Sequence, residues 1–148
     1  MAGYSALTHL ECSRTGERFP ADAPRGLSPA GAPLLARYDL EAASRTLRPE
    51  ALAARRAGMW RYHELLPAPS GEAVVSLGEG MTPLLAAPRL GARLGLSALY
   101  VKDEGNNPTG SFKARGMSAA ISMARLFRVG KIAVPTAGNA GGAAAAYA

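Results

Sequence analysis

Cysteine, lysine and aromatic residues are scarce in this sequence of 148 residues. Cys12 is the only cysteine, which excludes a framework of intramolecular disulfides. Arginine supplies most of the basic residues, and no ladder of aromatic residues accompanies it, although the net charge is +6. The basic residues therefore indicate a solvated helical surface, and we expect no nucleic acid as a partner.

Long hydrophobic runs and a secretory leader are also lacking. The first ten residues have neither a basic start nor an uninterrupted apolar stretch, and the charge-free stretch at residues 132–148 contains Pro135, Asn139 and several glycines. These would leave backbone polar groups unsatisfied in lipid. We expect no membrane span and a cytoplasmic location, and the 48% of hydrophobic residues suffices for one core.

The first half of the chain is rich in residues that interrupt regular structure. Closely spaced prolines and glycines predict loops or a small hairpin in the first forty residues, and Pro49 then suits the start of a helix. Residues 73–77 are a strand candidate, and residues 90–96 a short helix.

The second half alternates strand and helix patterns. Residues 99–101 and 131–134 are short apolar strand candidates, and each precedes a polar loop and a helix, the first over residues 111–127 and the second from residue 139. This order predicts an α/β fold with a parallel sheet and flanking helices. Both polar loops then meet at the carboxyl edge of the sheet, where ligands bind.

Lys113 stands in the first turn of the first of these helices, where the helix dipole disfavours a cation. A neutral amine or an imine would relieve that conflict, and lysine is the side chain that forms Schiff bases with aldehydes such as pyridoxal phosphate. Ser111 is a candidate cap for this helix. Taken alone, a single lysine is more often a solvated surface residue.

Residues 136–142, Thr-Ala-Gly-Asn-Ala-Gly-Gly, form a second group of small and polar residues between a strand and a helix. Backbone N–H groups at such a turn bind anions, and Asn139 has an amide suited to a ring hydroxyl or phenolate oxygen. The alternative is a tight turn into a closely packed alanine and glycine helix.

Three segments, which follow one another along the chain in the family's own order, resemble motifs of the threonine synthase family of fold-type II pyridoxal-phosphate enzymes. Residues 99–113 resemble the family's cofactor-lysine signature, residues 76–84 its upstream loop, and residues 136–139 its asparagine loop. The resemblance implies the tryptophan synthase beta-like fold and pyridoxal 5'-phosphate as the cofactor. Ala114 departs from the acidic residue that follows the lysine in many relatives.

The resemblance also implies a role for each matching residue. Lys113 would form the Schiff base and move protons, and Asn139 would hold the 3-oxygen of the cofactor. Thr136, Ala137 and Gly138 would receive the substrate carboxylate, and Thr82 is a further substrate-binding candidate.

Residues 1–47 resemble the zinc-ribbon extension of some threonine synthase-like proteins, but only Cys12 remains of the four thiols that such a site needs. We therefore expect a ribbon-like extension without a metal, followed by residues 48–148 as the N-terminal part of the catalytic domain. Because family members are much longer, we expect a truncated chain or completion by a partner, and a homodimer when complete.

The expected activity is that of a lyase in threonine biosynthesis, which converts O-phospho-L-homoserine and water to L-threonine and phosphate. One alternative is another fold-type II lyase, such as a threonine or serine dehydratase or ammonia-lyase. Another is a non-catalytic remnant that keeps the fold.

Overall fold

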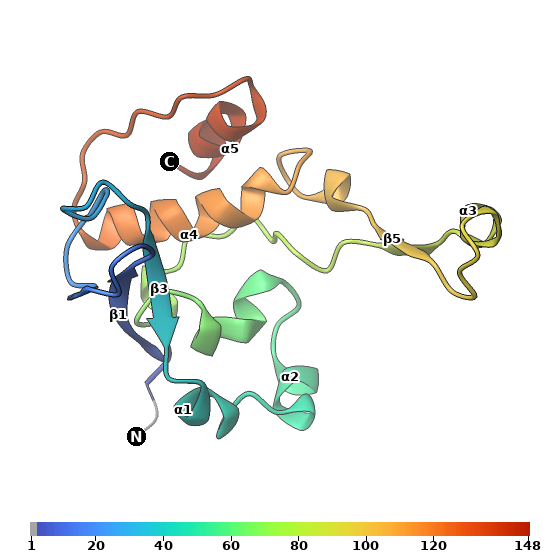
Figure 1. The fold of residues 1–148 in the computed structure, drawn as a ribbon, viewed down its shortest axis with the longest axis horizontal. Coiled ribbons are helices and arrows are strands. Elements are labelled where there is room, and N and C mark those ends of the chain that lie inside the picture. Colours follow the sequence, from blue (N-terminus) through green and yellow to red (C-terminus); the bar gives the residue numbers. More distant parts are fainter. Residues whose placement is uncertain (1–2) are drawn as a thin grey trace.

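The N-terminal part of the chain forms a small antiparallel sheet. In the computed structural model, which describes residues 3–148, β1 (Leu7–Cys12) lies between β2 (Arg18–Phe19) and β3 (Leu34–Tyr38) (Figure 1). Gly16 has a φ of 73° in the turn between β1 and β2, a conformation that glycine adopts without strain. The expected hairpin region is therefore confirmed, with a third strand.

Short helical segments connect this sheet to the rest of the molecule. α1 (Leu40–Ser44) is capped by Asp39, whose carboxylate accepts from the Ala42 N–H at 2.8 Å. α2 (Pro49–Ala54) begins at a proline as expected, and η1 (Met59–Leu65) and η2 (Gly71–Ala73) are 3-10 turns.

The buried carboxylate of Glu64 holds these segments together. Arg55 binds both of its oxygens, at 2.6 and 2.8 Å, and the Thr46 hydroxyl donates to it at 2.7 Å. The Arg55 hydrogen bonds lower the pKa of Glu64 to about 2, against the opposing effect of burial. The ion pair therefore joins η1 to the end of α2 and to the turn after α1.

An arm leaves the body of the molecule (Figure 1). It consists of β4 (Leu84–Ala86), α3 (Pro88–Arg93) and β5 (Tyr100–Lys102), and the two strands pair antiparallel. The helix expected at residues 90–96 is present here, shifted by a few residues towards the N-terminus. The expected parallel sheet is not confirmed, because every strand pair in residues 3–148 is antiparallel.

Two helices follow the arm. η3 (Glu104–Asn106) leads to α4 (Lys113–Leu126), and a long connection then leads to α5 (Asn139–Tyr147). Both long helices are confirmed close to their expected bounds. α4 packs against α5, and in Figure 1 both begin on the side that faces the arm.

The prediction of a strand at residues 73–77 is wrong, and the serines of α4 explain why. The Val75 N–H donates to Ser122 Oγ at 2.8 Å, and the Val75 carbonyl lies 2.7 Å from Ser118 Oγ. The Ser122 hydroxyl satisfies the Val75 N–H, and the single proton of the Ser118 hydroxyl is within reach of both the Val75 carbonyl and the Glu79 carboxylate. This segment therefore lies extended along α4, and no strand of residues 3–148 pairs with it.

The prediction of a strand at residues 131–134 is also wrong for the described part of the chain. This segment is extended, but no strand pairs with it between residues 3 and 148. It borders a cavity of about 930 Å³ whose wall also includes Val75 and Tyr147. A strand forms only where a neighbouring backbone completes its hydrogen bonds, so the local pattern was insufficient.

The core lies between α4, α5 and the extended segment that precedes residues 76–82, here called the motif loop. Ala114, Ile121 and Tyr147 are buried together, and Val75 and Met117 pack against them. Met117 and Ile121 are four residues apart on α4, so both project from the same face of that helix. None of the helices in residues 3–148 is long and apolar enough to cross a bilayer.

The ion pair of Glu64 predicts an acid-sensitive fold. Because its folded pKa lies below the ordinary value of 4.5, the contribution of Glu64 is complete above that value and is lost as pH falls towards about 2. We expect the free energy of unfolding, measured by urea denaturation, to decrease over this range. Glu64→Gln should be less stable by about 3 kcal/mol at pH 7, because Arg55 stays buried without its partner, and should show a weaker pH dependence. An unchanged pH dependence would contradict this assignment.

Candidate functional site

The motif loop at residues 76–82 is held by a fully buried carboxylate. Glu79 accepts hydrogen bonds from Tyr147 OH and Ser118 Oγ, both at 2.6 Å, and from Ser76 Oγ at 3.0 Å and the Leu77 N–H at 3.1 Å. Ser118 lies on α4 and Tyr147 on α5. One side chain therefore connects the loop to both helices.

The hydrogen bonds keep Glu79 ionised although it is buried. Burial alone would raise the pKa of Glu79, but hydrogen bonds led by those of Ser118 and Tyr147 outweigh it, so the pKa is lowered. Burial and the nearby Glu79 carboxylate together raise the pKa of Tyr147, which keeps the phenol protonated as a donor. The site thus contains a stable buried anion without a cation in direct contact.

A second carboxylate, Glu104, connects the other end of the loop to α4. Arg115 binds both Glu104 oxygens at 2.6 and 2.8 Å, and the Thr82 hydroxyl donates to one of them at 2.6 Å. These hydrogen bonds, that of Arg115 first, lower the pKa of Glu104 to about 2. Asn107 donates to Glu104 at 3.0 Å and accepts from the Gly80 N–H at 3.1 Å, which closes the network.

Gly80 is required where the loop passes η1. Its φ is 100°, and a Cβ at this position would lie 2.7 Å from the Met59 nitrogen. The Met59 N–H donates to the Glu79 carbonyl at 2.7 Å. The Gly-Glu-Gly sequence therefore allows close backbone approach on one side and a buried carboxylate on the other.

Lys113 is the first residue of α4, directly after the polar loop. Its ammonium nitrogen lies 4.4 Å from the centre of the Phe112 ring, and no carboxylate of residues 3–148 pairs with it. Ser111 does not cap the helix as expected, since no side chain caps α4 and the Ser111 hydroxyl is buried without a partner. The Thr109 hydroxyl is also buried and unpartnered, so two polar atoms near Lys113 lack the hydrogen bonds that buried groups normally make.

The second expected motif lies at the start of α5. Gly138 has a φ of 133°, and Asn139 begins the helix with an exposed side chain. Thr136 Oγ1 accepts from the Gly138 N–H at 2.9 Å and the Gly141 N–H at 3.0 Å. Thr136 therefore organises the turn itself, and its hydroxyl and these two N–H groups are already engaged with one another.

The structure brings the expected residues together to different degrees. Lys113 and Asn139 lie at the starts of two helices that contact each other and begin on the same side (Figure 1). Thr82 connects to the Lys113 helix through Glu104 and Arg115, and it is buried rather than open to a ligand. Ala137 is exposed in the turn before α5.

Comparison with known proteins identifies the family. Residues 75–148 match the pyridoxal-phosphate dependent enzymes. The chain belongs to this family. The match includes Lys113, Asn139 and the whole motif loop, which agrees with the resemblance seen in the three motifs.

Relatives within this family share the name threonine synthase. The protein of Methanocaldococcus jannaschii is 38% identical over 92% of this chain and 34% of its own length. The Synechocystis sp. protein is 43% identical over 68% of this chain and 27% of its own length. The Methanosarcina acetivorans protein is 42% identical over 60% of this chain and 22% of its own length. The chain spans about a third of the length of the M. jannaschii protein and less of the others.

The residues around Lys113 fit a pyridoxal-phosphate group. An amine without an acidic partner is free for an aldehyde, and the unpartnered hydroxyls of Thr109 and Ser111 are donors in the loop that leads to it. No group of three or more His, Cys, Asp or Glu residues in the described chain is arranged to hold a metal ion. Cys12 lies buried in β1, and its Sγ donates to Ser28 Oγ at 3.1 Å.

Sequence reasoning missed the residues that hold this site in place. Glu79 and Glu104 lie within the motifs at residues 76–84 and 99–113, but the sequence predicts no role for them. Nor does it predict a role for the partners that reach them from the two helices, Arg115, Ser118 and Tyr147. One signal was present, because Glu79 is the only charged residue between Glu72 and Arg89. A lone charge in an apolar segment is typical of a buried, hydrogen-bonded group.

The Glu79 network predicts the effect of one neutral substitution. Glu79→Gln places an amide donor against two hydroxyl donors, and we expect a loss of about 1–3 kcal/mol in the free energy of unfolding by urea denaturation. Glu50→Gln is the matched control, because Glu50 is exposed on α2 and should change stability by less than about 0.5 kcal/mol. Equal effects of both substitutions would show that Glu79 has no special role.

Proposed function

We propose that this protein acts as a threonine synthase-like lyase, which converts O-phospho-L-homoserine and water to L-threonine and phosphate. The family membership of the chain and the shared name of its relatives support this reaction class. The observation that carries the proposal is the amine of Lys113 at the start of α4, which pairs with no carboxylate among residues 3–148 and follows a loop with two unpartnered buried hydroxyls.

Lys113 is proposed to attach the cofactor and to carry protons. Pyridoxal phosphate, when bound, supplies an electron sink for the substrate's carbanions. The Lys113 amine has a flexible stem, so once released it can accept a proton at one substrate carbon and return it to another. Phe112 contacts it from one side and limits the positions of the ammonium group.

The remaining site residues are proposed to bind and orient. Asn139, at the start of α5, would donate to the 3-oxygen of the cofactor, and Thr136, Ala137 and Gly138 would bind the substrate carboxylate at the same turn. The Gly138 N–H first has to leave Thr136 Oγ1 for this. Thr82 is the further substrate-binding candidate. Its hydroxyl first has to leave Glu104, or else it acts by positioning the loop through that contact.

Three further proposals concern the whole protein. It takes a small amino-acid substrate, works in the cytoplasm and is a homodimer when complete.

The division of the chain into two segments is a separate proposal. Residues 1–47 form a ribbon-like extension without zinc, and residues 48–148 form the N-terminal part of the catalytic domain. The family match from residue 75 onwards supports the second segment.

The three lysines of the chain allow a direct test of Lys113. We expect pyridoxal phosphate followed by borohydride to label Lys113 selectively, as measured by peptide mass spectrometry, with an imine absorbance band before reduction. Lys102 and Lys131 are internal controls and should stay largely unlabelled. Equal labelling of all three lysines, or an unchanged band in Lys113→Ala, would refute the assignment.

The products separate the proposed reaction from its alternative. We expect the protein, loaded with pyridoxal phosphate, to release phosphate from O-phospho-L-homoserine and little ammonia from threonine or serine. Lys113→Ala should abolish the release, because the cofactor's attachment and the proton carrier are lost together. Ammonia release alone would favour a threonine or serine dehydratase, and the absence of both products a non-catalytic protein.

A further inference from the structure

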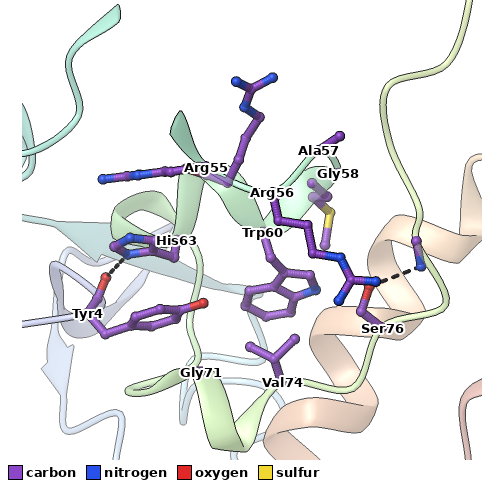
Figure 2. Close-up of a pocket in the computed structure, with 13 residues that line it drawn as sticks. Tyr4, Arg55, Arg56, Ala57, Gly58, Trp60, His63, Gly71, Val74 and Ser76 are labelled. Carbon is purple, nitrogen blue, oxygen red and sulfur yellow. Dashed lines mark hydrogen bonds between the residues drawn. The ribbon is translucent and has the colours of Figure 1, made fainter. Parts of the chain in front are cut away.

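A second cavity lies between η1 and the segment that leads into the motif loop. Its volume is about 310 Å³, and its wall includes Tyr4, Trp60 and His63 together with Ser76 and Gly78 (Figure 2). Neither Lys113 nor Asn139 lines it. The cavity is therefore distinct from the cofactor site and is linked to it by the motif loop and by the contact of Trp60 with Ser118 on α4.

The charge on the wall of this cavity is positive. Three arginines line it, Arg55, Arg56 and Arg61, and no aspartate or glutamate does. The Glu64 carboxylate neutralises Arg55, and Arg61 donates to the Leu52 carbonyl. Arg56 is exposed and pairs with no carboxylate among residues 3–148, so one uncompensated guanidinium faces this space.

Three aromatic rings line another part of this cavity. The Tyr4 and His63 rings stack with their centres 4.0 Å apart and their planes 11° apart, and in Figure 2 Trp60 lies beside them. Trp60 is held in place because its Nε1 donates to Ser118 Oγ at 2.7 Å. Fixed aromatic faces favour a planar ring as the neighbour.

We infer that this cavity binds a phosphate monoester that carries a planar ring. The Arg56 guanidinium supplies a forked, charged donor for the phosphate oxygens, and Trp60 with the Tyr4–His63 stack supplies the surface for the ring. The phenol of Tyr4 stays protonated, since burial raises its pKa, and therefore adds a donor and no repelling charge. The inference does not depend on the proposed function.

The position of the cavity gives such binding a consequence for the motif loop. Ser76 and Gly78 form its edge, and Ser76 Oγ donates to Glu79 and accepts from the Gly78 N–H. Trp60 reaches the same carboxylate through Ser118. A ligand here contacts Ser76, which donates to Glu79, and Trp60, which donates to Ser118, another donor to Glu79.

Trp60 allows a direct measurement because it is the only tryptophan of the chain. We expect phenyl phosphate, titrated at low ionic strength, to change the Trp60 fluorescence saturably. Arg56→Gln should weaken binding by about tenfold or more, and Arg56→Lys less, because lysine keeps the charge but not the fork. Arg48→Gln, on an exposed arginine outside this cavity, is the matched control and should bind as the wild type does.

The comparison ligands separate the two halves of the inference. Inorganic phosphate should bind more weakly than phenyl phosphate, and phenol more weakly still. Added salt should lower the affinity for phenyl phosphate. The inference is overturned if phenol binds as tightly as phenyl phosphate, if inorganic phosphate equals it, if Arg48→Gln weakens binding as much as Arg56→Gln, or if no saturable change occurs. Lys113→Ala should leave binding intact, and loss of binding there would place the ligand in the cofactor site instead.

Discussion

The buried Glu79 carboxylate is the interaction on which the arrangement of this molecule depends. It joins the motif loop to α4 through Ser118 and to α5 through Tyr147, across 39 and 68 residues of sequence. An unpaired charge in the interior costs several kcal/mol unless hydrogen bonds replace its water. Because four donors meet at Glu79, the helices and the loop have to be in register for the charge to be stable. The free-energy cost of burying the Glu79 charge thus restricts how the motif loop, α4 and α5 can be arranged.

The two carboxylates of the site are stabilised in different ways. Glu79 is surrounded by neutral O–H and N–H donors, whereas Glu104 is neutralised by the Arg115 guanidinium. Glu104 is also partly exposed, so solvent screens its ion pair, while no solvent reaches Glu79. The Glu79 end of the loop is therefore the more rigid anchor. At the Thr82 end, water can compete for the ion pair of Glu104 with Arg115. This end is linked to Arg115, which is two residues from Lys113 on α4.

Local patterns were enough for the helices and insufficient for the sheet. α4 and α5 follow from the helical patterns over residues 111–127 and from residue 139, which act within a few residues. The strand candidate around Val75 failed because its backbone groups meet Ser118 and Ser122, 43 and 47 residues further on. The same limit applies to the site. Lys113 and Asn139 were visible as motif residues, whereas Arg115 and Tyr147 gain a role only when the chain has folded.

Ser111 shows how local chemistry can give way to the requirements of a site. Its sequence position favours a helix cap, but the hydroxyl caps nothing, and α4 begins without any side-chain cap. A missing cap typically costs about 1 kcal/mol, and a buried unpaired hydroxyl costs at least as much. The fold bears both costs within two residues of Lys113, in a helix otherwise anchored by Ser118, Ser122 and Arg115. The stabilising contacts lie along α4, and the unsatisfied hydroxyls of Thr109 and Ser111 lie in the loop just before it, where the proposed chemistry needs free donors.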